Sequence, residues 1–226
     1  MNRNDIQRSL RLLDYDSYEI RVINPNRNSV SSQIIHSFAE LSSLCHQHDG
    51  QSNLYVGINE RNKVNSTKLE IQAVNFLVMD LDSVRLNKNQ PADQQELDAT
   101  IQASKLIKDW FADNGFFPPV RAMSGNGCHL WIRIPRLPLT GLEMTTQWES
   151  RVKQFYLQME SILPTDLQQK VKIDPIQDVT RIIKLIGTTS VKSNPTDDRP
   201  NRLSCWLDAP ESIEVDRKLF VYISSL

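Results

Sequence analysis

Hydrophobic and polar side chains alternate along several short stretches of the chain, and each of these stretches predicts a β-strand. The clearest are residues 18–23 (YEIRVI), 53–59 (NLYVGIN) and 128–134, in which apolar residues take every second position. Residues 73–81 (AVNFLVMDL) are almost continuously apolar, as is typical of a strand buried on both faces. Shorter strands are predicted at 120–123, 171–174 and 203–207.

Apolar residues at helical spacing predict helices between these strands. The first is expected to start at Ser29 or Ser31 as its cap and to end at Asp49-Gly50. Strands and helices alternate without regular βαβ units, which predicts an α/β or α+β fold. The C-terminal LFVYI fits either a strand or a helix. Further helical patterns cover about 94–113, 143–162 and 177–185.

Composition adds a few constraints. Over 226 residues, 26 Lys and Arg nearly balance 27 Asp and Glu, so a phosphate-binding surface has to be a local patch. The three cysteines form no CxxC pair, which argues against a disulfide framework or a structural zinc and suits a reducing compartment. The N-terminus lacks the apolar core of a signal peptide, and no apolar run approaches the roughly 20 residues of a membrane span. We therefore expect a cytoplasmic protein with no membrane partner.

Asp80 and Asp82 end the apolar stretch FLVMDLD and are the first candidates for chemistry. Residues i and i+2 of a strand share a face, so both carboxylates point to one side of the predicted sheet. Two close carboxylates repel each other, and Mg²⁺ or Mn²⁺ would relieve that repulsion through oxygen ligands of this kind. A strand that simply runs out into solvent can also end in aspartate, but an acidic pair after a buried strand favours a functional site.

A glycine-rich turn at residues 124–127 (SGNG) precedes the predicted strand 128–134. Its glycines allow backbone N–H groups to turn toward an anion, and His129 begins the strand beside it, on the same face as Trp131 and Arg133. A histidine in this place is a candidate to contact phosphate. Trp131 would either stack on a base or sugar or pack in an interface, and the pattern does not separate the two.

The third candidate region is residues 172–192 (KIDPIQDVTRIIKLIGTTSVK). Alternation sends Lys172 and Asp174 to the polar face of a short strand, while Arg181 and Lys184 lie on one side of the predicted helical segment. Taken alone, this region is best interpreted as an amphipathic helix with solvated basic residues. Together with the acids and the turn it gains weight, because a third carboxylate and several cations are what metal-assisted phosphoryl transfer needs.

The segments MDLD, SGNGCH and IDPIQDVTRIIKLIGTTSVK resemble, in content and order, the three motifs of the archaeo-eukaryotic primase superfamily, and more narrowly its primase-polymerase branch. The resemblance spans roughly residues 18–192. It implies an α+β prim-pol fold in which an N-terminal α/β module (residues 1–66) packs on an RRM-like sheet module (residues 67–226) within a single catalytic domain, 1–226. It also implies a DNA primase or polymerase that joins dNTPs or NTPs to a 3′-hydroxyl by a two-metal mechanism.

The resemblance further implies roles for individual residues. Asp80, Asp82 and Asp174 would be catalytic and would hold two divalent ions, Mg²⁺ or Mn²⁺. The expected partners are a DNA template and a DNA or RNA primer, with a helicase or another replication, repair or CRISPR component in trans or on a longer parent chain. The nucleotide would be bound by Ser124, Gly125, Asn126, Gly127, His129, Arg181, Lys184 and Lys192.

Departures from the family pattern leave alternatives open. Lys184 stands where arginine is usual, which keeps the charge but loses bidentate geometry, and Asp178 competes with Asp174 as the third acid. A non-catalytic replication-initiator domain that binds nucleic acid would share the fold. FLVMDLDSV also matches the first motif of haloacid-dehalogenase-type phosphatases, but that motif usually opens a doubly wound fold and Asp80 lies far into the chain. A DxD glycosyltransferase would leave SGNGCH unexplained.

Overall fold

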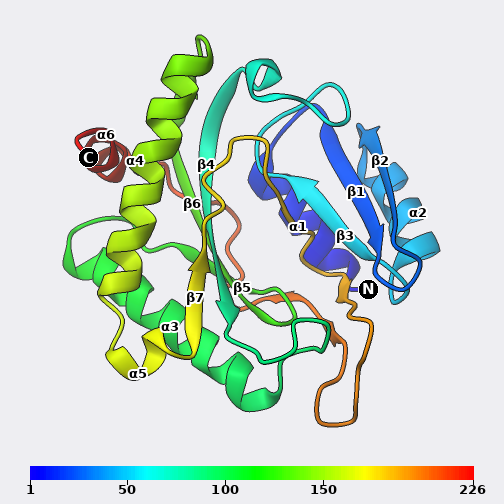
Figure 1. The fold of residues 1–226 in the computed structure, drawn as a ribbon. Helices are drawn as coiled ribbons and strands as arrows, with labels where there is room; N and C mark the ends of the chain where they lie inside the picture. Colours follow the sequence, from blue (N-terminus) through cyan, green and yellow to red (C-terminus); the bar gives the residue numbers. More distant parts are fainter.

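The computed structural model describes all residues from Met1 to Leu226 and contains two main β-sheets. All strand pairs in the first sheet are antiparallel. Helices α1 (Arg3–Leu13) and α2 (Phe38–His48) lie beside this sheet (Figure 1). Its strand order is β2-β1-β3-β8, formed by Ser29–Ile35, Tyr18–Asn24, Asn53–Gly57 and Ile182–Lys184.

The second sheet has five antiparallel strands, and helices α3 (Gln94–Asp113) and α4 (Leu142–Ser161) cover the face that is turned away from the first sheet (Figure 1). The chain enters this sheet in the order β4-α3-β5-β6-α4-β7, which is the β-α-β-β-α-β connectivity of ferredoxin-like folds. The strand order is β11-β5-β6-β4-β7, formed by Cys205–Trp206, Val120–Met123, Gly127–Pro138, Ala73–Ser83 and Val171–Asp174. The predicted α+β class is confirmed.

Short elements complete the molecule. The C-terminal LFVYI is helical, because it belongs to α6 (Arg217–Ser224), which buries Leu219 and Ile223 and packs on α4 and β6. The apolar side chains of both sheets form one continuous core. None of the helices combines the length and the apolar character that crossing a bilayer requires. The other short elements are η1 (Lys68–Glu70), α5 (Thr165–Gln168), β9 (Thr189–Ser190) and β10 (Arg202–Leu203).

Strand β4 lies at the centre of the second sheet, between β6 and β7, and its apolar run is buried as predicted. On β6, Trp131 is completely buried and packs edge-on against Phe76 and Trp206, with ring centroids 6.3 and 5.1 Å away. Of the two interpretations of Trp131, the packed interface residue is therefore the one that the structure supports. The indole is inaccessible to a base or a sugar.

The prediction of a helix that starts at Ser29 or Ser31 is wrong for residues 29–35. Residues 29–35 form strand β2, which pairs with β1 through a hairpin in which Asn28 adopts a positive φ of 49°. Helix α2 begins only at Phe38, where the Ser37 hydroxyl accepts a hydrogen bond from Glu40 N. Isoleucines and serines that fit a helical spacing also fit an edge strand, and the open edge of β1 decides between them.

The helical segment predicted at 177–185 is also wrong, because residues 182–184 form strand β8. This strand pairs with β3, with Lys184 opposite Tyr55. Arg181 and Lys184 therefore do not share one side of a helix. The two consecutive isoleucines before Lys184 favour a strand once a free strand edge is available. The chain also crosses the boundary expected near residue 66, since β8 from the second part completes the first sheet.

Candidate active site

Asp80, His129 and Asp174 lie in one row across three neighbouring strands of the second sheet. On β4, Asp80 is opposite His129 of β6 on one side and opposite Asp174 of β7 on the other. Asp82, two residues further along β4, is opposite Gly127 of β6 and shares a face with Asp80. The sheet thus brings together the three motifs that the sequence placed far apart.

A largely polar cavity of about 190 Å³ adjoins this row, and residues of both sheets line it. Three predicted site residues, Asp174, Gly125 and Gly127, do not line the cavity. The predicted site residues that do line it are Asp80, Asp82, Ser124, Asn126, His129, Arg181, Lys184 and Lys192. Most of the residues inferred from the motifs therefore meet in one place.

The two acids on β4 hold their protons more tightly than ordinary aspartates. Their side chains are only 27% and 28% exposed. Burial, with the charge of Asp174 as the next cause, raises the pKa of Asp80 to about 7. Burial and the charge of Asp80 raise the pKa of Asp82 to about 6. Clustered carboxylates with raised pKa values are stabilised by a bound cation, and carboxylate oxygens are ligands that a hard divalent metal accepts.

Asp174 is paired within its own strand, because the Lys172 ammonium contacts its carboxylate. No three Asp, Glu, His or Cys side chains are grouped closely enough in this structure to hold a metal ion. A metal site made by all three acids stays a prediction. The competing acid, Asp178, accepts two hydrogen bonds of 2.7 Å from Thr180 and lies outside the cavity.

His129 is buried, with 1% of its surface exposed, and its Nε2 lies 3.5 Å from Oδ1 of Asp80. Burial lowers the pKa of His129 to about 4, so the imidazole is neutral at physiological pH. Its Nδ1 is buried and has no hydrogen-bond partner. A neutral imidazole offers one N–H donor and one acceptor nitrogen. His129 can thus donate a hydrogen bond to a ligand in the cavity, but it brings no positive charge.

Basic side chains enter the cavity from the segment that includes β8 and its continuation. Lys184 is buried, donates a hydrogen bond of 2.7 Å to the Thr189 carbonyl and lies 5.9 Å from the ring centroid of Tyr55. Burial lowers the pKa of Lys184 to about 7. Burial also lowers the pKa of Lys192, although the charges of Asp82 and Asp80 oppose that shift. An anion in the cavity would be attracted to both lysines.

The glycines of the SGNG turn are required by close packing. A Cβ on Gly127 would lie 2.0 Å from the carbonyl oxygen of Leu81 on β4. A Cβ on Gly125, whose φ is +109°, would lie 2.3 Å from the Cβ of Ser190. The turn is closed by a hydrogen bond of 2.9 Å from Ser124 N to the Gly127 carbonyl. Gly127 thus lets the turn lie directly against the strand that carries the acids, and Gly125 lets it pack against Ser190 of β9.

Asn126 lines the cavity, and both ends of its side-chain amide make hydrogen bonds within the protein. Its Oδ1 accepts a hydrogen bond of 2.8 Å from Ala92 N, and its Nδ2 donates one of 2.9 Å to the Ser190 hydroxyl. Its backbone carbonyl accepts from the Ser83 hydroxyl at 3.2 Å. Asn126 therefore ties the turn to the loop after β4 and to β9, which positions the walls of the cavity.

The motifs missed several lining residues, among them Asn53, Tyr55 and Ser190. Asn53 and Tyr55 lie two residues apart on β3, so the alternation in NLYVGIN contained the signal that they share a face. Burial and the charges of Asp80 and Asp82 raise the pKa of Tyr55 to about 12, which places its hydroxyl in the field of the acids. Ser190 carried no signal in the sequence.

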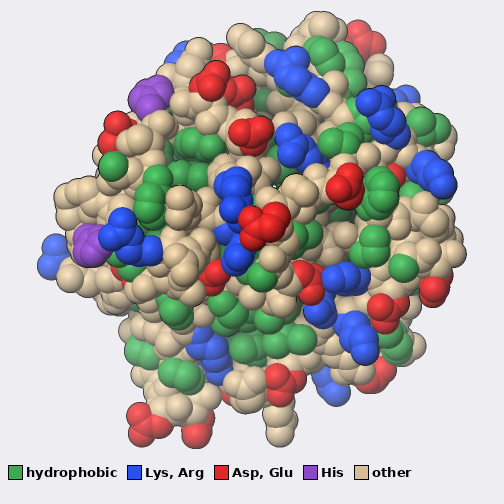
Figure 2. Space-filling model, turned by 180° about the vertical axis from the view of Figure 1, so that it is seen from behind, with side chains coloured by type: hydrophobic (Ala, Val, Ile, Leu, Met, Phe, Trp, Pro, Cys, Tyr) green, Lys and Arg blue, Asp and Glu red, His purple; other side chains and the backbone are tan.

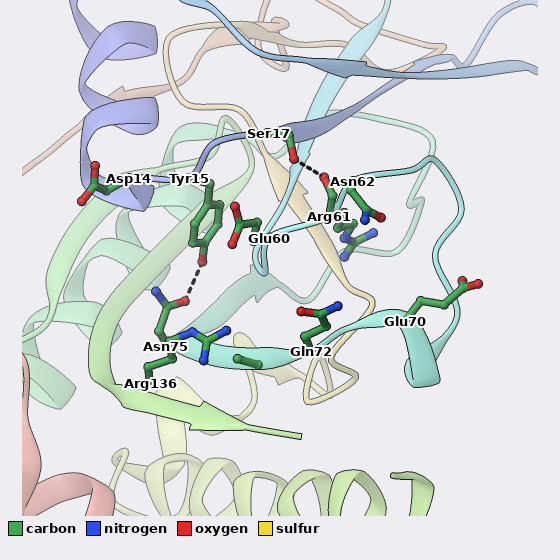
Figure 3. Close-up of a pocket in the computed structure, with 11 residues that line it drawn as sticks. Asp14, Tyr15, Ser17, Glu60, Arg61, Asn62, Glu70, Gln72, Asn75 and Arg136 are labelled. Carbon is green, nitrogen blue, oxygen red and sulfur yellow. Dashed lines mark hydrogen bonds between the residues drawn. The ribbon is translucent and has the colours of Figure 1, made fainter. Parts of the chain in front are cut away.

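A larger cavity, of about 370 Å³, lies at the other end of β4 (Figure 3). It is lined by Ala73 and Asn75, near the start of β4, and the Tyr15 hydroxyl lies 2.7 Å from Oδ1 of Asn75. None of the residues predicted for the site lines this cavity. Cavity size alone therefore does not locate the candidate chemistry.

The two sheets, with their shared core and the site between them, have the fold of primase-polymerase catalytic domains, as the sequence predicted. The crystal structure of primase RepB′ is similar with a TM-score of 0.59 and 13% identity, over 99% of this chain and 61% of that one. The catalytic domain of primase RepB′ in complex with initiator DNA gives a TM-score of 0.58 and 12% identity, over 99% of this chain and 92% of that one.

The polymerase domain of ligase D from Mycobacterium tuberculosis, in complex with DNA, has a TM-score of 0.52 and 15% identity, over 88% of this chain and 78% of that one. At these identities the likeness is one of fold. The chain spans about 61% of the length of the first RepB′ structure. No family model and no curated protein sequence matches it.

Proposed function

We propose that this chain is a template-dependent nucleotidyltransferase that joins nucleoside triphosphates to a 3′-hydroxyl, as DNA primases and polymerases do. The observation that carries the proposal is the meeting, in one cavity, of two carboxylates from β4 with three basic side chains from β8 and the segments that flank it. A triphosphate with its metal ions would satisfy both sets of charges at once. The prim-pol fold of the chain supports the same function.

Each group would have a distinct part in this reaction. Lys184, Lys192 and Arg181 would bind phosphate oxygens through charge-assisted hydrogen bonds. Neutral His129 would donate a hydrogen bond to the phosphate that is attacked and would add no charge. Asp80 and its neighbouring acid would hold Mg²⁺ or Mn²⁺, and a metal bound there would neutralise charge that develops during phosphoryl transfer. The protein then contributes mainly by positioning the reacting groups.

DNA is the proposed partner of the site. Two of the similar structures are complexes with DNA, one of them with initiator DNA. This chain has a formal net charge of -1, and acidic and basic side chains are interspersed on the face shown in Figure 2. Without a broad basic surface there, we expect template binding that is modest, salt-sensitive and dependent on basic residues near the cavity.

The deciding experiment is nucleotide incorporation on a primed and an unprimed DNA template, with Mg²⁺ or Mn²⁺ and with dNTPs or NTPs. The variant Asp80→Ala/Asp82→Ala should lose incorporation, while Asp109→Ala, an exposed acid on α3, should keep it. Circular dichroism would verify that both variants fold. If the wild-type protein incorporates nothing under either metal and still binds template, the non-catalytic initiator interpretation replaces this proposal.

The phosphatase alternative loses its structural basis. Haloacid-dehalogenase-type enzymes need a doubly wound, mainly parallel sheet, whereas every pair in the sheet that carries Asp80 and Asp82 is antiparallel. One observation favours the non-catalytic alternative. The carboxylate of Asp174 forms an ion pair with Lys172 and does not join the other two acids in a group that could hold a metal ion. The incorporation assay separates that alternative from the enzyme.

A further inference from the structure

Arg85 is a buried cation that lacks most of its hydrogen-bond partners. It lies two residues beyond the end of β4, and its side chain is 3% exposed. Its Nη2 donates to Oδ2 of Asp82 at 3.3 Å, while Nε and Nη1 are buried and have no partner. No other side chain of the protein has two buried polar atoms without a partner.

This pairing leaves the guanidinium undercompensated. An arginine side chain is always charged and has five N–H donors. A buried charge is stable only when it is paired and hydrogen-bonded. The one hydrogen-bond partner of Arg85 is Asp82, which engages Nη2 and leaves Nε and Nη1 unpaired. A further anion beside Arg85 would therefore supply the acceptors that its guanidinium lacks.

Other cations lie close to the same place. Lys192 lines the cavity together with Asp82, the hydrogen-bond partner of Arg85, and the positive charge of Arg85 adds to burial in lowering the pKa of Lys192. Lys88, an exposed residue of the loop after β4, acts on Lys192 in the same direction. Like charges that lie close together repel each other, and an anion between them relieves that repulsion. A multivalent anion such as a polyphosphate chain suits this group.

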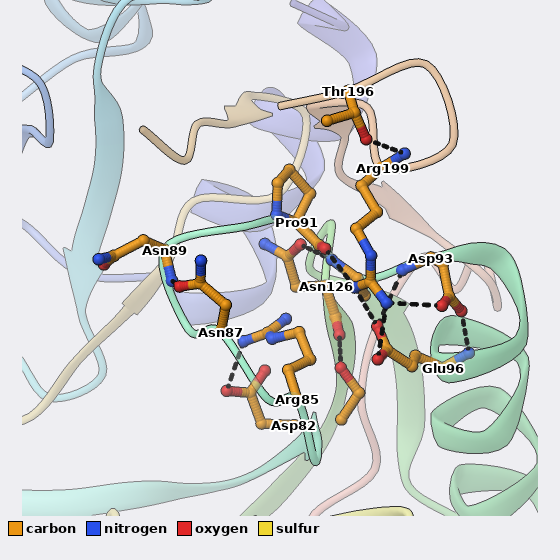
Figure 4. A network of polar contacts seen from close by, with 12 residues as sticks. Asp82, Arg85, Asn87, Asn89, Pro91, Asp93, Glu96, Asn126, Thr196 and Arg199 are labelled. Carbon is orange, nitrogen blue, oxygen red and sulfur yellow. Dashed lines mark hydrogen bonds and ion pairs between the residues drawn. The ribbon is translucent and has the colours of Figure 1, made fainter. Parts of the chain in front are cut away.

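The loop that carries Arg85 is anchored at its far end. Ala92 N donates to the side chain of Asn126, and Arg199 donates to the carboxylate of Asp93 at 2.7 Å (Figure 4). Figure 4 shows the side chain of Arg85 inside this loop, with its guanidinium turned toward Asp82. The position of Arg85 is therefore built into the network and is not that of a loose surface side chain.

We propose that Arg85 binds a phosphate oxygen of the nucleoside triphosphate and rests on Asp82 when no nucleotide is bound. This proposal rests on the proposed function: Arg85 does not itself line the cavity, but its hydrogen-bond partner Asp82 does, together with Lys192. A phosphate oxygen near Lys192 would supply the acceptor that the guanidinium lacks and would draw it away from Asp82. The freed carboxylate would then be available to a divalent ion, so nucleotide binding would prepare Asp82 for the metal.

The test measures binding in EDTA, so that it does not depend on catalysis. The probe is a fluorescent deoxyadenosine triphosphate analogue, with inorganic tripolyphosphate and deoxyadenosine as competitors. We expect Arg85→Met to weaken binding of the triphosphate by about tenfold to a hundredfold, as the loss of hydrogen bonds from a charged group does. The affinity of Arg85→Lys for the triphosphate should lie between those of the wild type and Arg85→Met, because lysine keeps the charge but lacks the planar, two-pronged donor geometry of arginine. Lys105→Gln, an exposed cation on α3, is the matched control.

A thermal-unfolding measurement separates binding from structure. Arg85→Met should unfold no earlier than the wild type without ligand, but it should lose the increase in Tm that tripolyphosphate gives the wild type. If Arg85→Met and Arg85→Lys bind the triphosphate as tightly as the wild type and Arg85→Met only unfolds earlier, Arg85 is a structural partner of Asp82 and the inference is overturned. If the wild type binds no triphosphate at all, with EDTA or with Mn²⁺, the proposed function fails as well.

Discussion

The Nε2 atom of His129 lies 3.5 Å from Oδ1 of Asp80, across the pair formed by β4 and β6. This separation is at the outer limit of a hydrogen bond, and a neutral imidazole adds no ionic attraction. The His129 side chain is buried, on the strand that pairs directly with the one that carries Asp80. The imidazole is thus positioned beside the acid and remains available to a ligand.

From this geometry, His129→Ala should raise the KM for the incoming nucleotide by about tenfold or more, because one hydrogen bond to a charged phosphate is lost. Template affinity should change much less. Steady-state kinetics and a DNA-binding assay on the same preparation measure the two effects. His46→Ala, at the exposed end of α2, is the control. A variant that binds template poorly and keeps its nucleotide KM contradicts the assigned role.

Lys184 should make stability depend on pH. Its pKa falls from the ordinary lysine value of 10.5 to about 7 in the folded protein, because of burial. Between these values the unfolded chain binds more protons than the native one, so the free energy of unfolding should rise with pH. Below about pH 7 both states are protonated and the full cost of the buried charge remains.

Lys184→Met removes this dependence. The free energy of unfolding of the variant should exceed that of the wild type by the largest amount at about pH 6.5. This difference should shrink steadily toward about pH 9.5. Urea unfolding at several pH values gives the two curves, with Lys105→Met as the control for an exposed lysine. Parallel curves for Lys184→Met and the wild type would show that the native lysine titrates normally. Nucleotide incorporation should be lost in Lys184→Met at every pH.

The buried pair of Glu19 and Arg61 should contribute strongly to the stability of the first sheet. The Glu19 carboxylate accepts hydrogen bonds from Arg61 at 2.6 Å and from Arg21 at 2.8 Å. Neither the Glu19 nor the Arg61 side chain is more than 1% exposed. Breaking one side of such a pair costs about 3–5 kcal/mol, so Glu19→Gln should lower the free energy of unfolding by that order. Glu211→Gln breaks an exposed pair with Arg11 and should cost less than about 1 kcal/mol. Equal effects would contradict the burial argument.

The same pair predicts sensitivity to acid. Burial opposes the charge of Glu19, but hydrogen bonds from Arg21 and Arg61 outweigh it and lower its pKa. Because the folded pKa is depressed, this stabilisation is present at neutral pH and is lost as the pH falls through the folded value. Acid unfolding of Glu19→Gln should therefore be shallower than that of the wild type.

Gly127 should tolerate no side chain. A Cβ there would lie 2.0 Å from the Leu81 carbonyl, so Gly127→Ala must push the turn away from β4. We expect a loss of more than about 2 kcal/mol in stability and a loss of incorporation, because the acid opposite Gly127 moves with the strand. Gly50→Ala is the control, since its φ of +80° is strained but no atom lies within 4 Å of the added carbon. Its cost should be about 1 kcal/mol, without an effect on activity.

The second sheet was largely predictable from the sequence, because its strands have strong local patterns. The apolar run that ends at Asp80 and the alternation after Gly127 fix which side chains share a face. Helices α3 and α4 are long enough for their periodicity to be clear. Resemblance to known motifs then supplied the roles, and the structure brings most of these residues to one cavity.

The failures arose where pairing over a long sequence distance decides the local structure. Strand β8 has only three residues, which is too few for a pattern of alternating hydrophobicity. It forms because its backbone pairs with the edge of β3. The engagement of Asn126 with Ala92 and Ser190 likewise depends on segments that are remote in the sequence. Arg85 belongs to none of the motifs, and its proposed role comes from two nitrogens that lack hydrogen-bond partners in the folded protein, which the sequence does not show.

The insertion of β8 into the first sheet has a mechanical consequence for the site. Asp80 and Asp82 belong to one sheet, whereas Lys184 belongs to the other. The distance between the acids and this lysine therefore depends on how the two sheets pack against each other, in addition to the rotamers of the side chains, so a change in that packing alters the site.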